Sequence, residues 1–174
     1  MHPLHSFRFC PVCGSDHFIE NNFKSKKCEI CGFIYYFNAA AATAIFITNR
    51  VGELLVVRRA KEPAKGSFDL PGGFIDMNET AEEAIIREVK EETGLQITKP
   101  DYLFSLPNIY TYSGFDVHTV DLFFQCETDT FSGMKAGDDA ESIFILRKND
   151  IKPELFGLVS IRRAIEIWLG NYEL

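Results

Sequence analysis

The sequence predicts an α+β fold in which a small cysteine-rich unit precedes one larger domain. Four of the five cysteines lie before residue 38, and beyond it strand-like segments combine with two helix-like segments. A chain of 174 residues is long enough for one catalytic-sized domain and a small appendage. We therefore expect a first unit at residues 1–38 and a main domain at residues 39–174.

The overall charge is acidic, because 25 Asp and Glu residues oppose 18 Lys and Arg residues. The net charge of −7 argues against nonspecific binding of nucleic acid over the whole surface, and it suggests that an anionic substrate needs metal ions. The hydrophobic fraction of 46% excludes a disordered or collagen-like chain. Residues 1–20 contain no apolar segment typical of a signal peptide, so we expect a cytoplasmic protein.

One segment, residues 30–49, has the length of a membrane span and carries no charge. Gly32 and Asn38 interrupt it, and residues 43–48 are β-branched and aromatic in the manner of a buried strand. We therefore expect a strand in this segment and no association with a membrane.

The cysteines before residue 38 form two pairs with the same short spacing. Cys10 and Cys13 belong to one Cys-x-x-Cys-Gly turn and Cys28 and Cys31 to a second, with fourteen residues between the pairs. Two such turns that face each other supply the tetrahedral thiolate set that zinc prefers, and four protein ligands leave no open position. We expect a structural zinc ribbon. Two disulfides are the alternative, which a reducing compartment disfavours.

Strand patterns recur through the main domain, where short apolar and β-branched runs are separated by turn residues. Residues 49–52 are turn formers and predict a hairpin between the first two strands. Cys126 lies in an apolar run and is expected to be a buried strand residue. The expected strands are residues 43–48, 53–59, 68–70, 101–106, 117–126 and 142–147.

Two helices are expected, at residues 80–93 and 159–169. Thr80 and Glu83 form a capping box at the start of the first helix, and Gly94 provides its stop. The second helix is amphipathic. Its inward side chains are expected to be Ile161, Ile165, Trp168 and Leu169.

The first helix carries carboxylates at an unfavourable spacing. Glu88, Glu91 and Glu92 lie at i, i+3 and i+4, where like charges repel each other. A divalent cation would remove this penalty, and oxygen ligands suit Mg²⁺ or Mn²⁺. A solvated charged face is the alternative.

The residues around this helix decide between the two interpretations. From Gly73 to Leu95 the chain fills every fixed position of the pattern G-x5-E-x7-R-E-U-x-E-E-x-G-U, where U is a bulky aliphatic residue. This segment, with the preceding Leu-Pro-Gly at 70–72, resembles the Nudix hydrolase box. The resemblance implies an α/β/α sandwich with a mixed sheet, and metal-assisted hydrolysis of a nucleoside diphosphate linked to another group.

The resemblance also implies roles for individual residues. Glu88, Glu91 and Glu92 would hold Mg²⁺ or Mn²⁺, and the backbone carbonyl of Gly73 would add a ligand. Glu79 and Arg87 would pair and hold the loop against the helix.

The general base is expected further along the chain, in the acidic segment 137–141. Glu141 is our candidate, and an exposed turn carboxylate is the alternative. Asp138 and Asp139 are expected to be turn formers.

The substrate is less closely defined than the reaction. A four-cysteine ribbon before a Nudix domain resembles the NADH pyrophosphatase group, whose Ser-Gln-Pro-Trp signature follows the box. This chain keeps the serine and proline as Ser105 and Pro107 but lacks the glutamine and tryptophan. Tyr110 or Tyr112 could stack on the base instead, and an ordinary strand aromatic is the alternative for each. We expect NADH, NAD or ADP-ribose as the substrate. Diadenosine polyphosphates and nucleoside triphosphates are alternatives, and the resemblance leaves a homodimer open.

A different class of function is a sensor that binds nucleotides or RNA without hydrolysis. Its footprint would be Phe23 with Lys24, Lys26 and Lys27. Because every box carboxylate is present and the net charge is negative, we expect an enzyme that acts on a small nucleotide, and no nucleic-acid partner.

Overall fold

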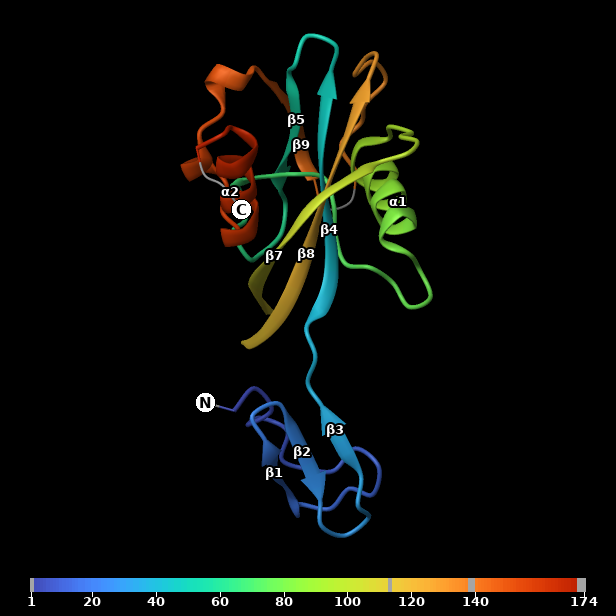
Figure 1. The fold of residues 1–174 in the computed structure, drawn as a ribbon, viewed down its shortest axis with the longest axis vertical. Helices are drawn as coiled ribbons and strands as arrows, with labels where there is room; N and C mark the ends of the chain where they lie inside the picture. The colour runs from blue at the N-terminus through green and yellow to red at the C-terminus, as the bar shows by residue number, and fades with distance from the viewer. Residues whose placement is uncertain (1, 113, 138–139, 172–174) are drawn as a thin grey trace. The chain divides into compact units, whose positions relative to one another are not determined.

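The computed structural model describes residues 2–112, 114–137 and 140–171, and the chain divides into two compact units, Met1–Ala39 and Ala40–Leu174. The first unit holds an antiparallel sheet in the order β1-β2-β3 (Figure 1). Cys10, Phe18 and Cys28 form its small core, against which Phe33 packs. The strands are β1 (Phe18–Asn22), β2 (Ser25–Cys28) and β3 (Ile34–Tyr36).

The second unit contains a mixed six-stranded sheet in the order β6-β5-β4-β8-β7, with β9 paired to β5. The pair β4–β8 is parallel and the other pairs are antiparallel, so the mixed sheet is confirmed. The expected hairpin is present as the β4–β5 pair, which registers at Thr48 and Leu54. The strands are β4 (Ala40–Asn49), β5 (Leu54–Arg59), β6 (Phe68–Asp69), β7 (Asp101–Tyr112), β8 (Phe115–Thr128) and β9 (Ala140–Leu146).

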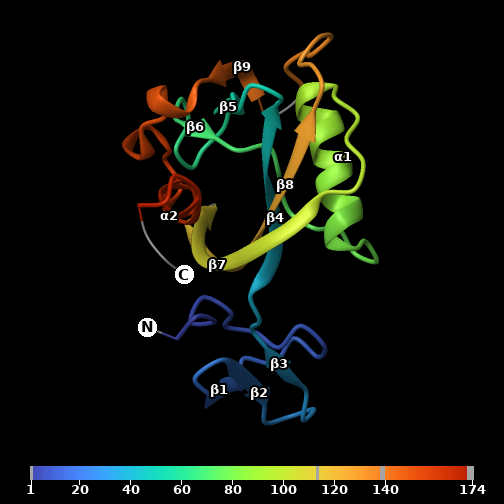
Figure 2. The same ribbon diagram turned by 45° about the horizontal axis from the view of Figure 1, so that its top comes forward.

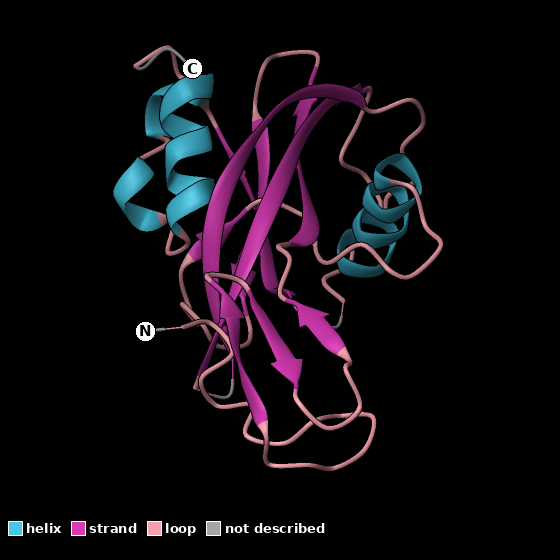
Figure 3. Cartoon of the chain, turned by 60° about the horizontal axis from the view of Figure 1, so that its bottom comes forward, coloured by secondary structure: helices cyan, strands magenta, loops and turns pink. Residues whose placement is uncertain are grey.

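Strand β7 is longer than the sequence predicts. It continues past Leu106 and Pro107 to Tyr112 and pairs with β8 along a long curved ribbon (Figure 3). Proline is tolerated because β7 is the last strand in the sheet order, so its missing N–H costs no ladder bond. The added residues 107–112 include side chains that line a cavity in the second unit.

Two helices cover opposite faces of this sheet (Figure 2). Helix α1 (Ala81–Thr93) has the expected capping box between Thr80 and Glu83 and ends at Gly94 in a left-handed conformation, with φ of 73°. Helix α2 (Val159–Trp168) follows two short 3₁₀ turns, η1 (Lys148–Asp150) and η2 (Pro153–Leu155). The order of layers is therefore α/β/α, as expected for a Nudix sandwich.

The alternation of side chains along β4 produces the two cores. Ala44 and Phe46 point to the α2 side, where Phe46 stacks on Trp168 with ring centroids 5.4 Å apart. Ile45 and Ile47 point to the other side and pack with Ile85 and Val89 of α1. A strand with both faces buried reads as a continuous apolar run, which explains the uncharged segment in the sequence.

The remaining expectations about buried residues are met in part. Ile161 and Ile165 are buried, and Trp168 and Leu169 are partly buried against the same core. Cys126 lies in β8 and is only partly buried, and this burial raises the pKa of its thiol to about 11. Among the described residues, the helices are too short or too polar to cross a bilayer.

Candidate active site

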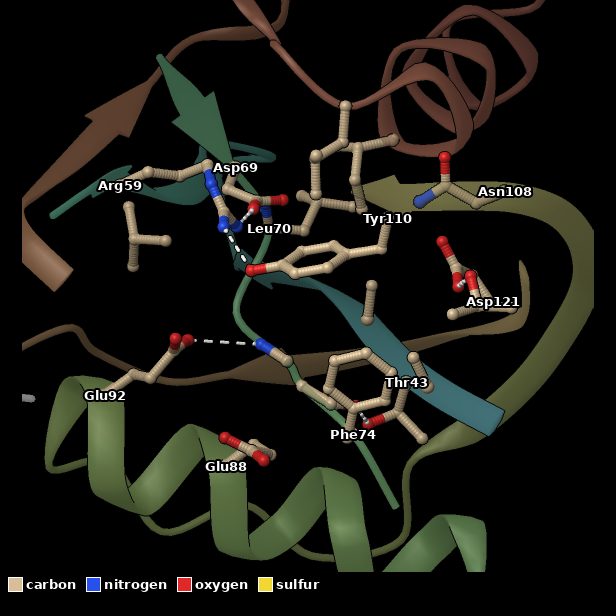
Figure 4. Close-up of a pocket in the computed structure, with 18 of the residues that line it drawn as sticks. Thr43, Arg59, Asp69, Leu70, Phe74, Glu88, Glu92, Asn108, Tyr110 and Asp121 are labelled. Carbon is tan, nitrogen blue, oxygen red and sulfur yellow. Dashed lines mark hydrogen bonds and ion pairs between the residues drawn. The ribbon is translucent and has the colours of Figure 1, made fainter. Parts of the chain in front are cut away.

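A cavity of about 420 Å³ opens in the second unit, between α1, the sheet and the start of α2 (Figure 4). Glu88 and Glu92 of α1 lie at one end of it, and Asn108 and Asp121 of the sheet lie at the other. The loop after β6 forms one wall through Gly72, Gly73 and Phe74. The cavity therefore extends from the carboxylates of α1 to polar side chains of the sheet near the start of α2.

The loop between β6 and α1 lies directly on β4. The carbonyls of Pro71 and Gly73 accept the backbone N–H groups of Ile45 at 3.0 Å and Thr43 at 2.8 Å. A Cβ atom at Gly72 would collide with the carbonyl oxygen of Thr43, and one at Gly73 would collide with the carboxyl group of Glu88. Position 72 therefore requires glycine for this close approach, whereas a side chain at Gly73 would have to displace the flexible carboxyl end of Glu88.

The three carboxylates of α1 are not equivalent. Glu92 is 8% exposed and accepts the backbone N–H of Gly72 at 3.1 Å. Glu88 also lines the cavity. Glu91 does not line it; its side chain is 53% exposed and accepts Nη1 of Arg87 at 3.2 Å. Two of the three expected metal ligands, Glu88 and Glu92, therefore line the cavity. The third, Glu91, forms an ion pair with Arg87 at the surface.

Arg87 connects this helix to the loop, as expected. It donates two hydrogen bonds to Glu79, at 2.8 and 2.9 Å, and one to Glu88 at 2.8 Å. Its Nη2 also donates to the carbonyl of Phe74 at 3.1 Å. The bonds from Arg87, together with the N–H of Asp76, lower the pKa of Glu79 to about 2. This arrangement fixes the loop against α1 next to the carboxylates.

The donor atoms at this end suit a hard divalent cation, because they are carboxylate and carbonyl oxygens. The carbonyl of Gly73 already accepts the N–H and, at 3.4 Å, the hydroxyl of Thr43, so a cation would have to share it. Among the described residues, only the four cysteines of the first unit bring three or more potential ligand atoms within 4.8 Å of one another. Glu88, Glu91 and Glu92 fit Mg²⁺ or Mn²⁺ by their chemistry.

Tyr110 and Phe74 form an aromatic wall in the middle of the cavity. Their rings meet edge to face, with centroids 5.6 Å apart and planes at 81°. Nη2 of Arg59 donates to the Tyr110 hydroxyl at 3.1 Å, and the same guanidinium pairs with Asp69. Burial raises the pKa of Asp69, and Arg59 opposes this shift. The tyrosine is thus held by a buried ion pair.

The substrate-binding residues expected from the sequence fall into two groups. Tyr110 and Tyr112 line the cavity. Ser105 and Pro107 do not: their side chains are exposed, because odd-numbered residues of this part of β7 point to the opposite face of the strand. Only the tyrosines are therefore brought together with the carboxylates.

Glu141 is exposed at the start of β9 and does not line the cavity. Asp138 and Asp139 lie outside the described residues.

Sequence reasoning missed several polar residues of the cavity. Asn108 precedes Tyr110 by two positions on the same face of β7, so strand alternation was the signal that could have found it. Thr119 and Asp121 are brought to the cavity by the pairing of β8, which no local pattern indicates. The other polar lining residues that sequence reasoning missed are Thr43, Arg59, Lys61, Glu62, Asp69 and Asp76.

The first unit contains a second candidate site, formed by Cys10, Cys13, Cys28 and Cys31. The Sγ atoms of Cys10 and Cys31, and of Cys13 and Cys28, lie 3.6 Å apart. A tetrahedral zinc ion with 2.3 Å bonds separates its sulfurs by about 3.8 Å, whereas a disulfide requires about 2.05 Å. All four cysteines are free in the structure, the state that a zinc site requires and that two disulfides would not have. Backbone N–H groups, chiefly that of Cys31, lower the pKa of Cys28, which favours a thiolate.

Comparison with known proteins identifies the class. A family model described as the NUDIX domain matches residues 38–160. Over 146 residues the chain is 36% identical to an ADP-ribose pyrophosphatase of Methanocaldococcus jannaschii, which covers 82% of each chain. The chain belongs to the Nudix hydrolase family, whose members use divalent metal ions.

Other relatives agree with this class. An NAD-capped RNA hydrolase, NudC, of Vibrio vulnificus is 29% identical over 106 residues, which are 61% of this chain and 40% of the relative. The chain thus matches well under half the length of that relative. A NUDIX hydrolase from Nitrosomonas europaea has the same fold, with a TM-score of 0.73 at 19% identity over 94% of this chain and 91% of the other.

Proposed function

We propose that this protein hydrolyses the pyrophosphate bond of a nucleoside diphosphate joined to another group, with ADP-ribose as its preferred substrate. The observation that carries the proposal is the cavity that has Glu88 and Glu92 at one end and Tyr110 in its middle. It has room for a diphosphate beside the carboxylates and a base beside the ring. The pyrophosphatase relative, matched over 82% of both chains, favours ADP-ribose.

We assign the cation to Glu88, Glu92 and, from the sequence motif, Glu91. When bound, Mg²⁺ or Mn²⁺ supplies positive charge for the diphosphate and a water of lowered pKa. Arg87 keeps the loop bearing Gly73 against α1 through its paired bonds to Glu79. These bonds hold the carboxylates and the loop backbone in fixed positions relative to each other before a substrate binds.

Glu141 remains our candidate for the general base. It is the second residue of β9, which pairs with β5. Since it is exposed and outside the cavity lining, substitution by glutamine gives a direct test of the assignment. We expect a fall in the maximal rate with little change in KM if it takes the proton from the attacking water.

We further propose that Cys10, Cys13, Cys28 and Cys31 bind a structural zinc ion. The four sulfurs complete a tetrahedral shell and leave no position for substrate. Thiolates in this state fit a reducing cytoplasm, where we place the protein.

A second candidate substrate is NADH or NAD. It is favoured by the relatives named as NAD-capped RNA hydrolases and by the second cavity tyrosine, Tyr112. Because the chain lacks the tryptophan of the Ser-Gln-Pro-Trp signature, we rank ADP-ribose, the smaller substrate, above NADH and NAD.

The test is product analysis with purified, zinc-loaded protein and Mg²⁺ or Mn²⁺. The panel is ADP-ribose, NADH, NAD, diadenosine polyphosphates and nucleoside triphosphates. We expect AMP and ribose 5-phosphate from ADP-ribose, as hydrolysis requires. Glu92→Gln should reduce this rate at least about 100-fold, whereas Glu82→Gln, an exposed position on the same helix, should keep it. No turnover on any substrate, or full activity of Glu92→Gln, would refute the proposal.

A further inference from the structure

The end of the cavity remote from Glu88 and Glu92 has its own polar group, formed by Asn108, Thr119 and Asp121 (Figure 4). Asn108 pairs with Thr119 across the β7–β8 ladder, and Asp121 lies two residues further along β8. The three side chains therefore share one face of the sheet. None of them belongs to the motif segment around α1, and the proposed reaction gives them no role.

Asn108 is the first sign of a ligand at this end. Its side chain lines the cavity although the residue is only 8% exposed, and no described residue hydrogen-bonds its amide. Its amide atoms are not among the fully buried atoms that lack a partner, so they are open to the cavity, and a ligand that displaces water from them must replace its hydrogen bonds. The amide offers both N–H donors and a carbonyl acceptor to whatever fills the cavity.

Asp121 is the second indication of a ligand, because two hydrogen bonds fix its carboxylate and the carboxylate can still accept further hydrogen bonds. Its Oδ1 accepts the hydroxyl of Thr119 at 2.6 Å and its Oδ2 accepts the hydroxyl of Ser160 at 2.5 Å. It is 6% exposed, and within the described part of the chain no Lys, Arg or His side chain forms an ion pair with it. Each carboxylate oxygen keeps a lone pair, so the group calls for an N–H or O–H donor.

The surroundings favour a flat aromatic ligand over a sugar. Tyr110 and Phe74 present rings to the cavity, and Leu158 and Ile161 add an apolar floor next to Ser160. Nucleobases stack on such rings and keep their polar atoms at the edge. A ribose would need polar partners on several sides, and these residues do not provide them.

We propose that Asn108 and Asp121 recognise the amino edge of adenine and thereby select 6-aminopurine over 6-oxopurine nucleotides. The amino group would donate to Asp121, while the Asn108 amide pairs with the ring nitrogen and amino group, the pattern by which asparagine reads adenine in nucleic acids. A 6-oxo group would instead place an oxygen against the carboxylate. This inference rests on the proposed function, because it names the base of the same substrate.

The experiment compares kcat/KM for ADP-ribose and for its hypoxanthine analogue, in which oxygen replaces the amino group. We expect the wild type to prefer ADP-ribose by about 10- to 100-fold. Asp121→Asn should remove or reverse this preference, because an amide can donate to the 6-oxo group. Glu127→Gln, the same chemical change on an exposed residue of β8, should leave the ratio unchanged.

Two further measurements keep the outcomes distinct. If Asp121→Asn does not fold, Asn108→Ala should reduce the preference in its place. Binding of AMP and IMP by calorimetry should show the same ratio without any turnover, so an enzyme inactive on the whole panel would refute the proposed function and leave the base preference measurable. Equal handling of the two bases by the wild type, or an unchanged ratio in both variants, would overturn the inference.

Discussion

The close approach of Gly72 to strand β4 gives a prediction whose magnitude can be estimated. Gly72 has φ of 151°, and a Cβ atom there would collide with the Thr43 carbonyl oxygen and come within 2.8 Å of Ala44 Cα. These are backbone atoms of β4, which cannot move out of the way by a side-chain rotation. We therefore expect Gly72→Ala to push the loop off β4 and to break the bonds on either side, from Ile45 to Pro71 and from Thr43 to Gly73.

The magnitude follows from a comparison with Gly52→Ala. Gly52 also has positive φ, 78°, but no atom lies within 4 Å of its added Cβ, so only the conformational cost of about 1 kcal/mol applies. Gly72→Ala adds the loss of two backbone hydrogen bonds at about 1 kcal/mol each. We expect the free energy of unfolding to fall by about 2 kcal/mol more than in Gly52→Ala. For a domain of this size that is roughly 4–8 °C in Tm.

Thermal unfolding of the two variants, followed by circular dichroism, measures this difference. ADP-ribose turnover gives an independent check, because Glu92 accepts the N–H of Gly72 and would move with it. Gly52 lies in the β4–β5 turn, and its variant should keep wild-type turnover. Equal Tm values for the two variants, with equal turnover, would refute the reasoning from the close contact.

The remaining predictions concern the ion pair and the ribbon. The folded pKa of Glu79, about 2, lies below its ordinary value of 4.5, so its contribution to stability is complete above about pH 4.5 and disappears as the pH falls toward 2. Urea unfolding should show Glu79→Gln as less stable than the wild type at pH 7, with the gap closing toward pH 2; a constant gap would contradict this. Removal of zinc by a strong chelator should unfold residues 2–39, which NMR would show as a loss of dispersed amide signals from these residues. The Tm of the second unit, measured by thermal unfolding, should stay unchanged. Preparations that contain no zinc by elemental analysis, yet show a folded ribbon, would contradict the metal assignment.

The sequence predicted correctly those features that depend only on residues close together in the chain. The capping box at Thr80 and the stop at Gly94 bound α1 because both act within one turn of the helix. The cysteine spacing located the ribbon site for the same reason, although the ribbon's three strands were not expected. The predicted end of β7 at residue 106 was too early, because the sequence does not reveal that this strand lies at the sheet edge, where Pro107 is tolerated.

The cavity depended on information that is not local. Asn108 and Asp121 are thirteen positions apart in sequence, and only the register of β7 against β8 brings them to one face. Asp121 also needs Ser160 from α2, across another layer of the fold. The box motif therefore predicted the carboxylate end of the cavity, to which we assign the reaction, while the end that we assign to the base depends on strand pairing.

Helix α1 holds the carboxylates that we propose as cation ligands in a supported arrangement. Three carboxylates within five residues repel one another, and the protein offsets this with Arg87 and with the N–H of Gly72. Arg87 contacts Glu88 and Glu91 with one nitrogen and Glu79 with two others. If the cation that we propose took Glu88 and Glu91 as ligands, Arg87 could give up the Nη1 bonds to them and still keep its two bonds to Glu79. The loop would then stay against the helix with or without the cation.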